Sequence, residues 1–132
     1  MKASAIPPES DKYRKAVEGI CTDLRKAWER MVEEVLLNKT VERFDYGVKT
    51  QSLKGVLVED SDHQQIYFAM KKLSNFTAHD EAAGKQGQLP TVDELIETLE
   101  ELDTYRKTVD DRRKDTQKDR EKLEKPPTAN FA

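Results

Sequence analysis

An arginine and a glutamate, Arg25 and Glu29, lie one helical turn apart in a segment whose apolar residues recur at helical spacing. Side chains with this spacing are neighbours on a helix surface and often form an ion pair worth about 0.3–0.5 kcal/mol. Arg25 is bracketed by Cys21 and Trp28, which places it at the edge of the apolar face. A half-buried guanidinium there needs a fixed carboxylate partner. The pair is therefore either a tie to a neighbouring helix or part of an anion-binding site.

Downstream, Lys72, Asn75 and His79 follow one another at helical spacing. A histidine at the end of a helix usually caps it, because an imidazolium suits the negative end of the helix dipole. A histidine with an unperturbed pKa of about 6.5 also transfers protons at neutral pH. Combined with a cation that binds phosphate, it suits metal-free RNA cleavage, in which the 2′-hydroxyl attacks the adjacent phosphate. The spacing leaves the structural and the catalytic interpretations open.

Signatures of other catalytic and metal sites are missing from the sequence. The glycines at residues 84 and 87 flank a lysine, but no Ser or Thr follows that lysine as it does in a phosphate loop. Two histidines and one cysteine do not supply the ligand patterns of common zinc sites. We therefore expect no metal and no cofactor, and we expect His63 to be an exposed residue without a catalytic role.

Three helices are predicted to position these residues. The first begins at Ser10 or Asp11 and ends near Asn38, with one apolar stripe over about six turns. We expect this stripe to lie in the core, and it consists of Tyr13, Val17, Ile20, Leu24, Trp28, Met31 and Val35.

The segment Glu59-Asp60-Ser61-Asp62 signals the start of the second helix, which is predicted to run to about His79. Thr91 and Glu94 form a capping box at the start of the third helix. Between the helices, residues 39–60 read as two short helical turns or an irregular connector, and residues 80–90 read as a loop.

A single helical domain is expected over residues 11–110, after an irregular lead at residues 1–10. Residues 111–132 begin with a block of mixed charges, which predicts a charged helical extension or a disordered tail. The length of 132 residues suits one domain. The predicted fold class is all-α, an antiparallel bundle of three to five helices.

Composition limits the partners and the cellular location expected for the chain. A formal net charge of −3 gives no general attraction to nucleic acid or to an anionic membrane, so a nucleic-acid site would be a local patch. One cysteine excludes an internal disulfide and fits a reducing, cytoplasmic location. No segment is apolar enough for a signal peptide or a membrane span, and we expect no membrane association.

Several segments together resemble the C-terminal region of bacterial AAA/ABC-type defence ATPases related to the RloC and PrrC anticodon nucleases. The resemblance covers roughly residues 12–115. It is carried by residues 24–38, 41–44, 50–53, 72–80 and 89–95.

The resemblance implies roles for individual residues. Nuclease members of the family use an arginine, a glutamate one helical turn later and a downstream histidine, which correspond here to Arg25, Glu29 and His79 as catalytic residues. Lys72 and Asn75 would position the substrate.

The nuclease regions of that family also resemble HEPN domains, whose motif is Arg-Asn/Asp/His-x-x-x-His, so a HEPN-like bundle is expected. Ser74 stands where the motif has its arginine. Lys72 or Arg25 could take the place of that arginine in space. HEPN sites usually form between two copies, so the resemblance implies a homodimer.

The leading functional expectation is a metal-independent endoribonuclease or toxin that acts on tRNA in phage defence. The chain would be the C-terminal part of an AAA/ABC-type ATPase or its partner, in cis or in trans, and would not hydrolyse ATP alone. The alternative is a non-catalytic helical module that docks or regulates such an ATPase. The charged tail and the missing motif arginine favour this alternative.

Overall fold

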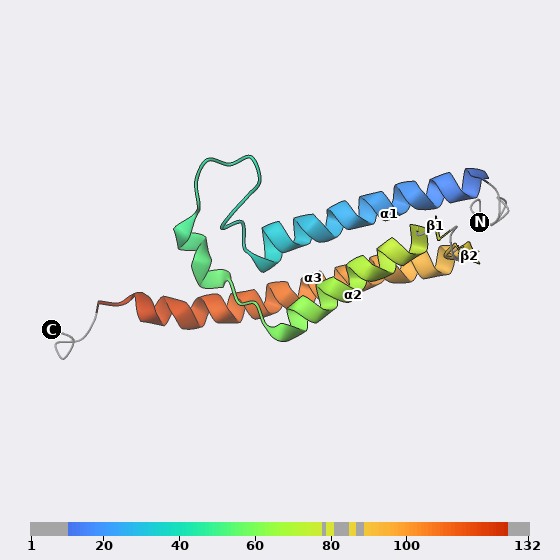
Figure 1. The fold of residues 1–132 in the computed structure, drawn as a ribbon. Coiled ribbons are helices and arrows are strands. Elements are labelled where there is room, and N and C mark those ends of the chain that lie inside the picture. The colour runs from blue at the N-terminus through green and yellow to red at the C-terminus, as the bar shows by residue number, and fades with distance from the viewer. Residues whose placement is uncertain (1–10, 78, 81–84, 87–88, 127–132) are drawn as a thin grey trace. The chain divides into compact units, whose positions relative to one another are not determined.

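The computed structural model describes residues 11–77, 79–80, 85–86 and 89–126 (Figure 1). These residues are helical apart from connecting segments and one pair of two-residue strands. In chain order the elements are α1 (Asp11–Met31), η2 (Val32–Leu36), η3 (Thr50–Gly55), α2 (Asp60–Thr77), β1 (His79–Asp80), β2 (Lys85–Gln86), α3 (Val92–Glu121) and η4 (Lys122–Glu124). The predicted all-α class is confirmed and is compatible with a helical bundle, whereas the HEPN-like identity stays a prediction.

The chain forms two compact units. Among the described residues, unit 1 contains those up to Glu29 and those from Glu59 to Thr104, and unit 2 contains Arg30–Val58 and those from Tyr105 onward. This grouping follows packing, whereas the boundary suggested at residue 110 followed the charge pattern. Residues 111–121 are helical, because α3 continues to Glu121.

Unit 1 is a three-helix arrangement in which α2 runs opposite to α1 and to the first part of α3 (Figure 1). The spacing of apolar residues on each helix creates one face that is removed from water. The buried apolar side chains of this unit are Tyr13, Val17, Cys21, Leu24, Trp28, Ala69, Leu73, Leu95 and Leu102.

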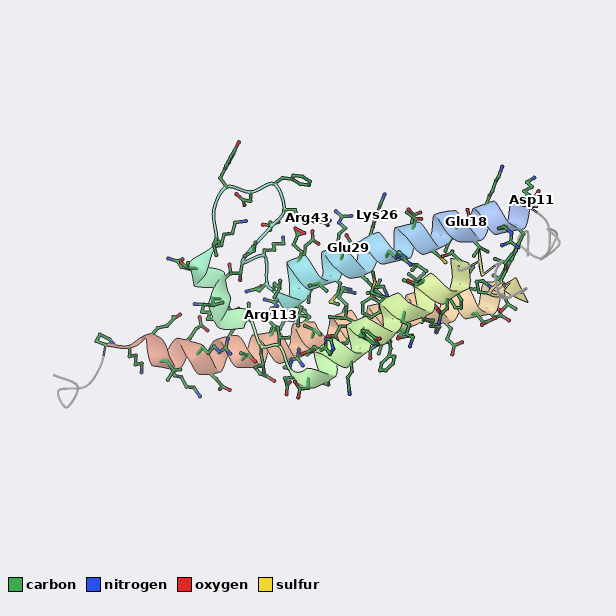
Figure 2. The ribbon with its side chains drawn as sticks, viewed as in Figure 1. Asp11, Glu18, Lys26, Glu29, Arg43 and Arg113 are labelled. Carbon is green, nitrogen blue, oxygen red and sulfur yellow. The ribbon has the colours of Figure 1, made fainter. Side chains whose placement is uncertain are left out.

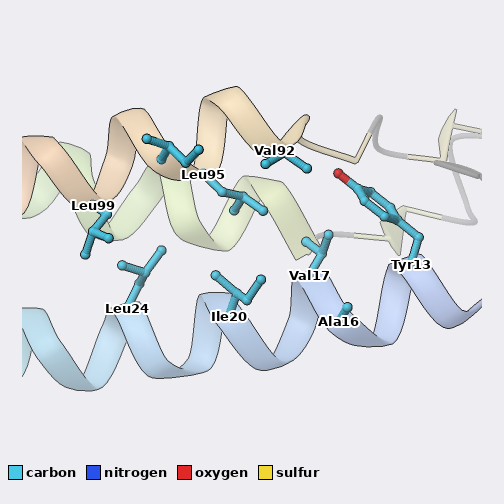
Figure 3. A pocket seen from close by; sticks show the side chains of 9 residues that line it. Tyr13, Ala16, Val17, Ile20, Leu24, Val92, Leu95 and Leu99 are labelled. Carbon is cyan, nitrogen blue, oxygen red and sulfur yellow. The ribbon is translucent and has the colours of Figure 1, made fainter. Parts of the chain in front are cut away.

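The predicted stripe is buried except at Val35, which is half-buried and lies in η2, and at Ile20. The side chain of Ile20 is 43% exposed, so its assignment to the core was wrong. The neighbouring Val17 is 1% exposed and Leu24 is 6% exposed. Ile20 lies at the edge of the α1 face that turns toward α3, where the second helix does not cover it (Figure 3).

The three predicted helix starts are confirmed, and capping contacts explain those of α2 and α3. The main-chain N–H of Glu94 donates to Thr91 Oγ1 at 3.1 Å, and the N–H of Thr91 donates to Glu94 Oε1 at 3.0 Å. This reciprocal capping box satisfies two donors that the helix itself leaves unpaired. At the start of α2 the N–H of Glu59 donates to the carboxylate of the buried Asp62 at 2.8 Å.

Both predicted helix ends differ in detail. The α-helical hydrogen bonding of α1 stops at Met31, and a π turn follows in which the N–H of Leu37 donates to the carbonyl of Val32 at 2.8 Å. Asn38 then turns the chain with a φ of 49°, a conformation that asparagine tolerates well. The second helix ends at Thr77, two residues before its predicted end at about His79.

Residues beyond Thr77 form a short strand pair where a plain loop was predicted. His79 of β1 pairs with Gln86 of β2 in an antiparallel register. The strand backbone replaces the helical hydrogen bonds that would have carried α2 further. Within the predicted loop, residues 81–84 and 87–88 lie outside the described residues.

Unit 2 joins the segment after α1 to the second part of α3. Its connector, residues 39–58, contains one 3-10 helix, Thr50–Gly55, and is otherwise irregular. Asn38 Nδ2 donates to the carbonyl of Ser52 at 3.0 Å, while Asn38 Oδ1 accepts from Arg113 Nη1 at 3.2 Å. One amide side chain thus links the connector to α3.

Other arginines of α3 donate to main-chain carbonyls of the same connector. Arg112 Nη2 donates to Leu57 O at 3.3 Å. Arg120 Nη1 donates to Leu53 O at 3.2 Å and also to Val56 O. A segment that has no regular strand or helix partner obtains its hydrogen bonds in this way.

Candidate functional site

Arg25 reaches from α1 to α2. It is half-buried, and its Nη2 donates to Ser74 Oγ at 2.5 Å. In the predicted HEPN-like motif, Ser74 takes the place of the arginine. The structure therefore brings a guanidinium from another helix to this position.

Glu29 is exposed on α1, one turn after Arg25 (Figure 2). An ion pair between these two residues stays a prediction.

Cys21 lies one turn before Arg25 on α1. Burial raises the pKa of the Cys21 thiol, and the charge of Arg25 opposes this shift only in part. A buried thiol with a raised pKa stays protonated at neutral pH, so Cys21 serves packing rather than nucleophilic chemistry.

Lys72 faces α3 and not Arg25. Its Nζ lies 3.7 Å from Glu101 Oε2 and 6.0 Å from the centroid of the Phe76 ring. Gln65 Nε2 donates to the same Glu101 carboxylate at 2.8 Å. Residues two apart on a helix point to different sides, so the Lys72 ammonium does not share the side of α2 on which Ser74 meets Arg25. Lys72 and Arg25 were both suggested as substitutes for the motif arginine, and of these two Arg25 contacts Ser74.

Asn75 is exposed on α2, next to Ser74. The backbone of His79 lies in β1, but its side chain lies outside the described residues, so the distance from His79 to Arg25 stays a prediction. His63 is exposed, as expected, and its ring centroid lies 5.9 Å from that of Tyr67.

An apolar groove between α1 and α3 was not predicted. It has a volume of about 240 Å³ and is lined by α1 from Tyr13 to Leu24 and by α3 from Val92 to Leu99 (Figure 3). Ile96 is 43% exposed and Leu99 is 54% exposed along it. The sequence signal that could have indicated this groove is the apolar stripe on α3, which is wider than two neighbouring helices cover.

One hydrogen bond closes the groove at the start of α1. The hydroxyl of Tyr13 donates to the carbonyl of Pro90 at 2.7 Å. Burial, followed by the nearby charge of Glu94, raises the pKa of the Tyr13 hydroxyl. The hydroxyl therefore remains a neutral donor, and Tyr13 ties α1 to the entry of α3.

Unit 2 exposes two aromatic side chains, Phe44 and Tyr46, on its connector. The basic residues beside them are engaged in ion pairs: Arg43 binds Glu33, and Lys49 Nζ binds Glu42 and lies 3.3 Å from Asp45 Oδ2. Exposed aromatics with free cations are typical of single-stranded nucleic-acid sites. Here the neighbouring carboxylates offset the positive charge.

Within residues 11–77 and 89–126, no three His, Cys, Asp or Glu side chains gather as metal ligands do. None of the helices described has the length and apolar character to cross a bilayer.

Comparisons with protein-family models, with curated proteins and with solved structures each found no match. The resemblance to the RloC and PrrC group therefore rests on the sequence motifs alone and stays a prediction.

Proposed function

We propose that this chain is a metal-independent endoribonuclease domain that acts on tRNA, as the C-terminal part or the partner of an AAA/ABC-type ATPase. The observation that supports the proposal most is the contact between Arg25 and Ser74. It supplies a cation at the position where this sequence lacks the motif arginine.

In the proposed reaction Arg25 binds the scissile phosphate and stabilises the charge that develops on the phosphorane. Ser74 and Glu29 orient the guanidinium, and Asn75 holds the neighbouring nucleotide. The 2′-oxygen forms a bond to phosphorus while the bond to the 5′-oxygen of the next nucleotide breaks. His79 takes the proton of the 2′-hydroxyl and then passes it, directly or through water, to the leaving 5′-oxygen, so the products are a cyclic phosphate and a 5′-hydroxyl.

Lys72 has a smaller part in this scheme than its sequence position suggested. Its ammonium is held near Glu101, and it would reach RNA only by leaving that carboxylate. We therefore assign it to substrate binding at the periphery and not to the cleavage step.

The test is tRNA cleavage by the purified chain and by single variants, followed on denaturing gels. Arg25→Ala and His79→Ala should each slow cleavage by about a hundredfold or more. Ser74→Ala should cause a smaller loss, because Arg25 remains but is less well oriented. The matched control is Arg30→Ala, an exposed arginine of α1 that also precedes a glutamate by one turn. Equal cleavage by all these proteins, or cleavage by none, contradicts the proposal.

The apolar groove favours a second candidate function, a helical interaction module. Contiguous exposed apolar surface commonly marks a binding site for another protein. This function needs neither Arg25 nor His79, so the two candidates can be tested separately.

A further inference from the structure

The groove between α1 and α3 is long enough to contact about three turns of another helix. Tyr13 and Leu24 mark its ends on α1, and the intervening residues span about 17 Å at 1.5 Å per residue. α1 and α3 run in the same direction along it, and α2 covers only the opposite side of the pair (Figures 1 and 3). A further helix laid in the groove would complete a four-helix bundle, the common way for helices to bury such a face.

The side chains along the groove divide into a buried floor and an exposed rim. Val17 and Leu95 are 1% and 7% exposed, whereas Ile20 and Leu99 are 43% and 54% exposed. The rim residues thus keep about half of their surface in water although branched apolar side chains surround them. Helix-in-groove recognition uses this arrangement, with ligand side chains at i, i+3 or i+4, and i+7 packing between the two rims.

Charge along the rim indicates what kind of helix fits. On α3, Asp93 and Glu100 lie within one turn of Ile96, and both are exposed. A hollow that starts at Leu99 is lined further by Glu100 and Asp103. The α3 edge of the groove is therefore acidic, most strongly at the Leu99 end.

The α1 edge does not change this balance. Lys12 is exposed beside Tyr13 at one end of the groove, and Asp23 is exposed beside Leu24 at the other end, so neither residue places a cation near Leu99. A second copy of this chain would bring another acidic α3 edge to the interface, and like charges placed together disfavour that pairing. A helix with lysine or arginine beside its apolar face complements the groove instead.

We infer that the groove between α1 and α3 binds an amphipathic helix of a partner protein, with basic residues flanking its apolar face at the Leu99 end. The inference rests on the second candidate function and is independent of the nuclease proposal. The acidic rim selects the partner, and the apolar floor supplies the affinity.

The test uses synthetic helical peptides of about 18 residues with one Leu/Ile face, labelled with a fluorophore and titrated with the whole chain by anisotropy. One peptide carries lysine and arginine beside that face, and a matched peptide carries glutamate at the same positions. The basic peptide should bind at least about tenfold more tightly at low salt. Equal binding of the two peptides, or no binding of either, overturns the inference.

Variants locate the site. Leu99→Glu should weaken the basic peptide about tenfold or more, and the double variant Glu100→Lys, Asp103→Lys should reverse the preference between the two peptides. The matched control is Phe68→Glu, which changes an apolar residue that is 59% exposed on α2, outside the groove. Loss of binding in this control but not in Leu99→Glu places the site elsewhere and overturns the inference.

Two further measurements separate alternative outcomes. Sedimentation tests whether the chain associates with itself, and self-association that Leu99→Glu abolishes would assign the groove to a second copy, against our inference. Arg25→Ala should bind the basic peptide as the wild type does, so failure of the nuclease proposal leaves this result unaffected.

Discussion

The two units of the chain are stabilised by different interactions. Unit 1 buries apolar side chains from three helices, with Trp28, Leu73 and Val17 among its largest fully buried groups. In unit 2 the buried apolar side chains of the described residues are fewer, namely Met31, Leu36 and Val109. Its connector is held instead by hydrogen bonds from arginine and asparagine side chains to main-chain carbonyls.

This difference shows that one helix, α3, can be packed in two ways along its length. Apolar burial is non-directional and tolerates small shifts, at about 25 cal/mol per Å² of buried apolar surface. Hydrogen bonds to carbonyls need defined distances and angles. Unit 1 should therefore respond most to lost volume, and unit 2 to lost geometry.

The largest effect is expected from Leu73→Ala in unit 1. Leu73 is 0% exposed, and removal of a buried leucine side chain costs about 2–5 kcal/mol of unfolding free energy because a cavity remains. Urea unfolding followed by circular dichroism measures the change. Leu99→Ala is the matched control, since the same atoms are removed from a side chain that is 54% exposed. Similar losses in the two variants would contradict the assignment of the core.

A smaller but specific effect is expected from Gly55→Ala in unit 2. A Cβ atom at Gly55 would lie 2.6 Å from Asn38 Nδ2 and 3.1 Å from Arg113 Cγ, so the link between the connector and α3 would have to move. Overpacking of this kind costs about 1–3 kcal/mol.

Hydrogen exchange should locate the damage of Gly55→Ala, with faster exchange in the connector and unchanged protection in α2. Gly47→Ala is the control, because no atom lies within 4 Å of the added Cβ there. If both alanine variants exchange alike, the close approach at Gly55 does not hold unit 2 together.

The features of unit 1 were easier to predict from the sequence than those of unit 2. The stripe on α1 and the capping box at Thr91 and Glu94 were predictable because they depend on residues within a few turns of one another. The contacts of Arg113 and Arg120 join residues far apart in the sequence. From composition alone such a charge block reads as a solvated surface or a tail.

The candidate site was predictable to a similar extent. The position of Arg25 beside the apolar face suggested a half-buried cation, and the structure supplies its contact, Ser74. Helical spacing could not show that Lys72 turns toward Glu101. It also could not show the exposure of Ile20, because this depends on which side of α1 the other helices cover.

The smallest expected effect is a pH dependence in unit 2. The main-chain N–H of Arg43 donates to Glu33 Oε1 at 2.7 Å, and Arg43 Nε donates to Oε2 at 3.0 Å. These bonds, the main-chain one first, lower the pKa of the Glu33 carboxyl. A lowered folded-state pKa stabilises the protein above the unfolded value of about 4.3, and this stability is lost as pH falls through the folded value.

Glu33→Gln keeps the shape and one acceptor but removes the charge, so the wild type should be more stable than this variant by a constant margin above about pH 5. The margin should narrow as pH falls further, because the carboxyl of the folded wild type then takes up its proton. Urea unfolding between pH 7 and pH 3 measures it, with Glu34→Gln at the adjacent exposed position as the control for loss of one charge. Curves for wild type and Glu33→Gln that stay parallel down to pH 3 would show that the bond to Arg43 does not stabilise unit 2. In that case the carbonyl contacts of Arg112 and Arg120 would remain as the polar ties of the connector, and the contrast with the apolar core of unit 1 would rest on them.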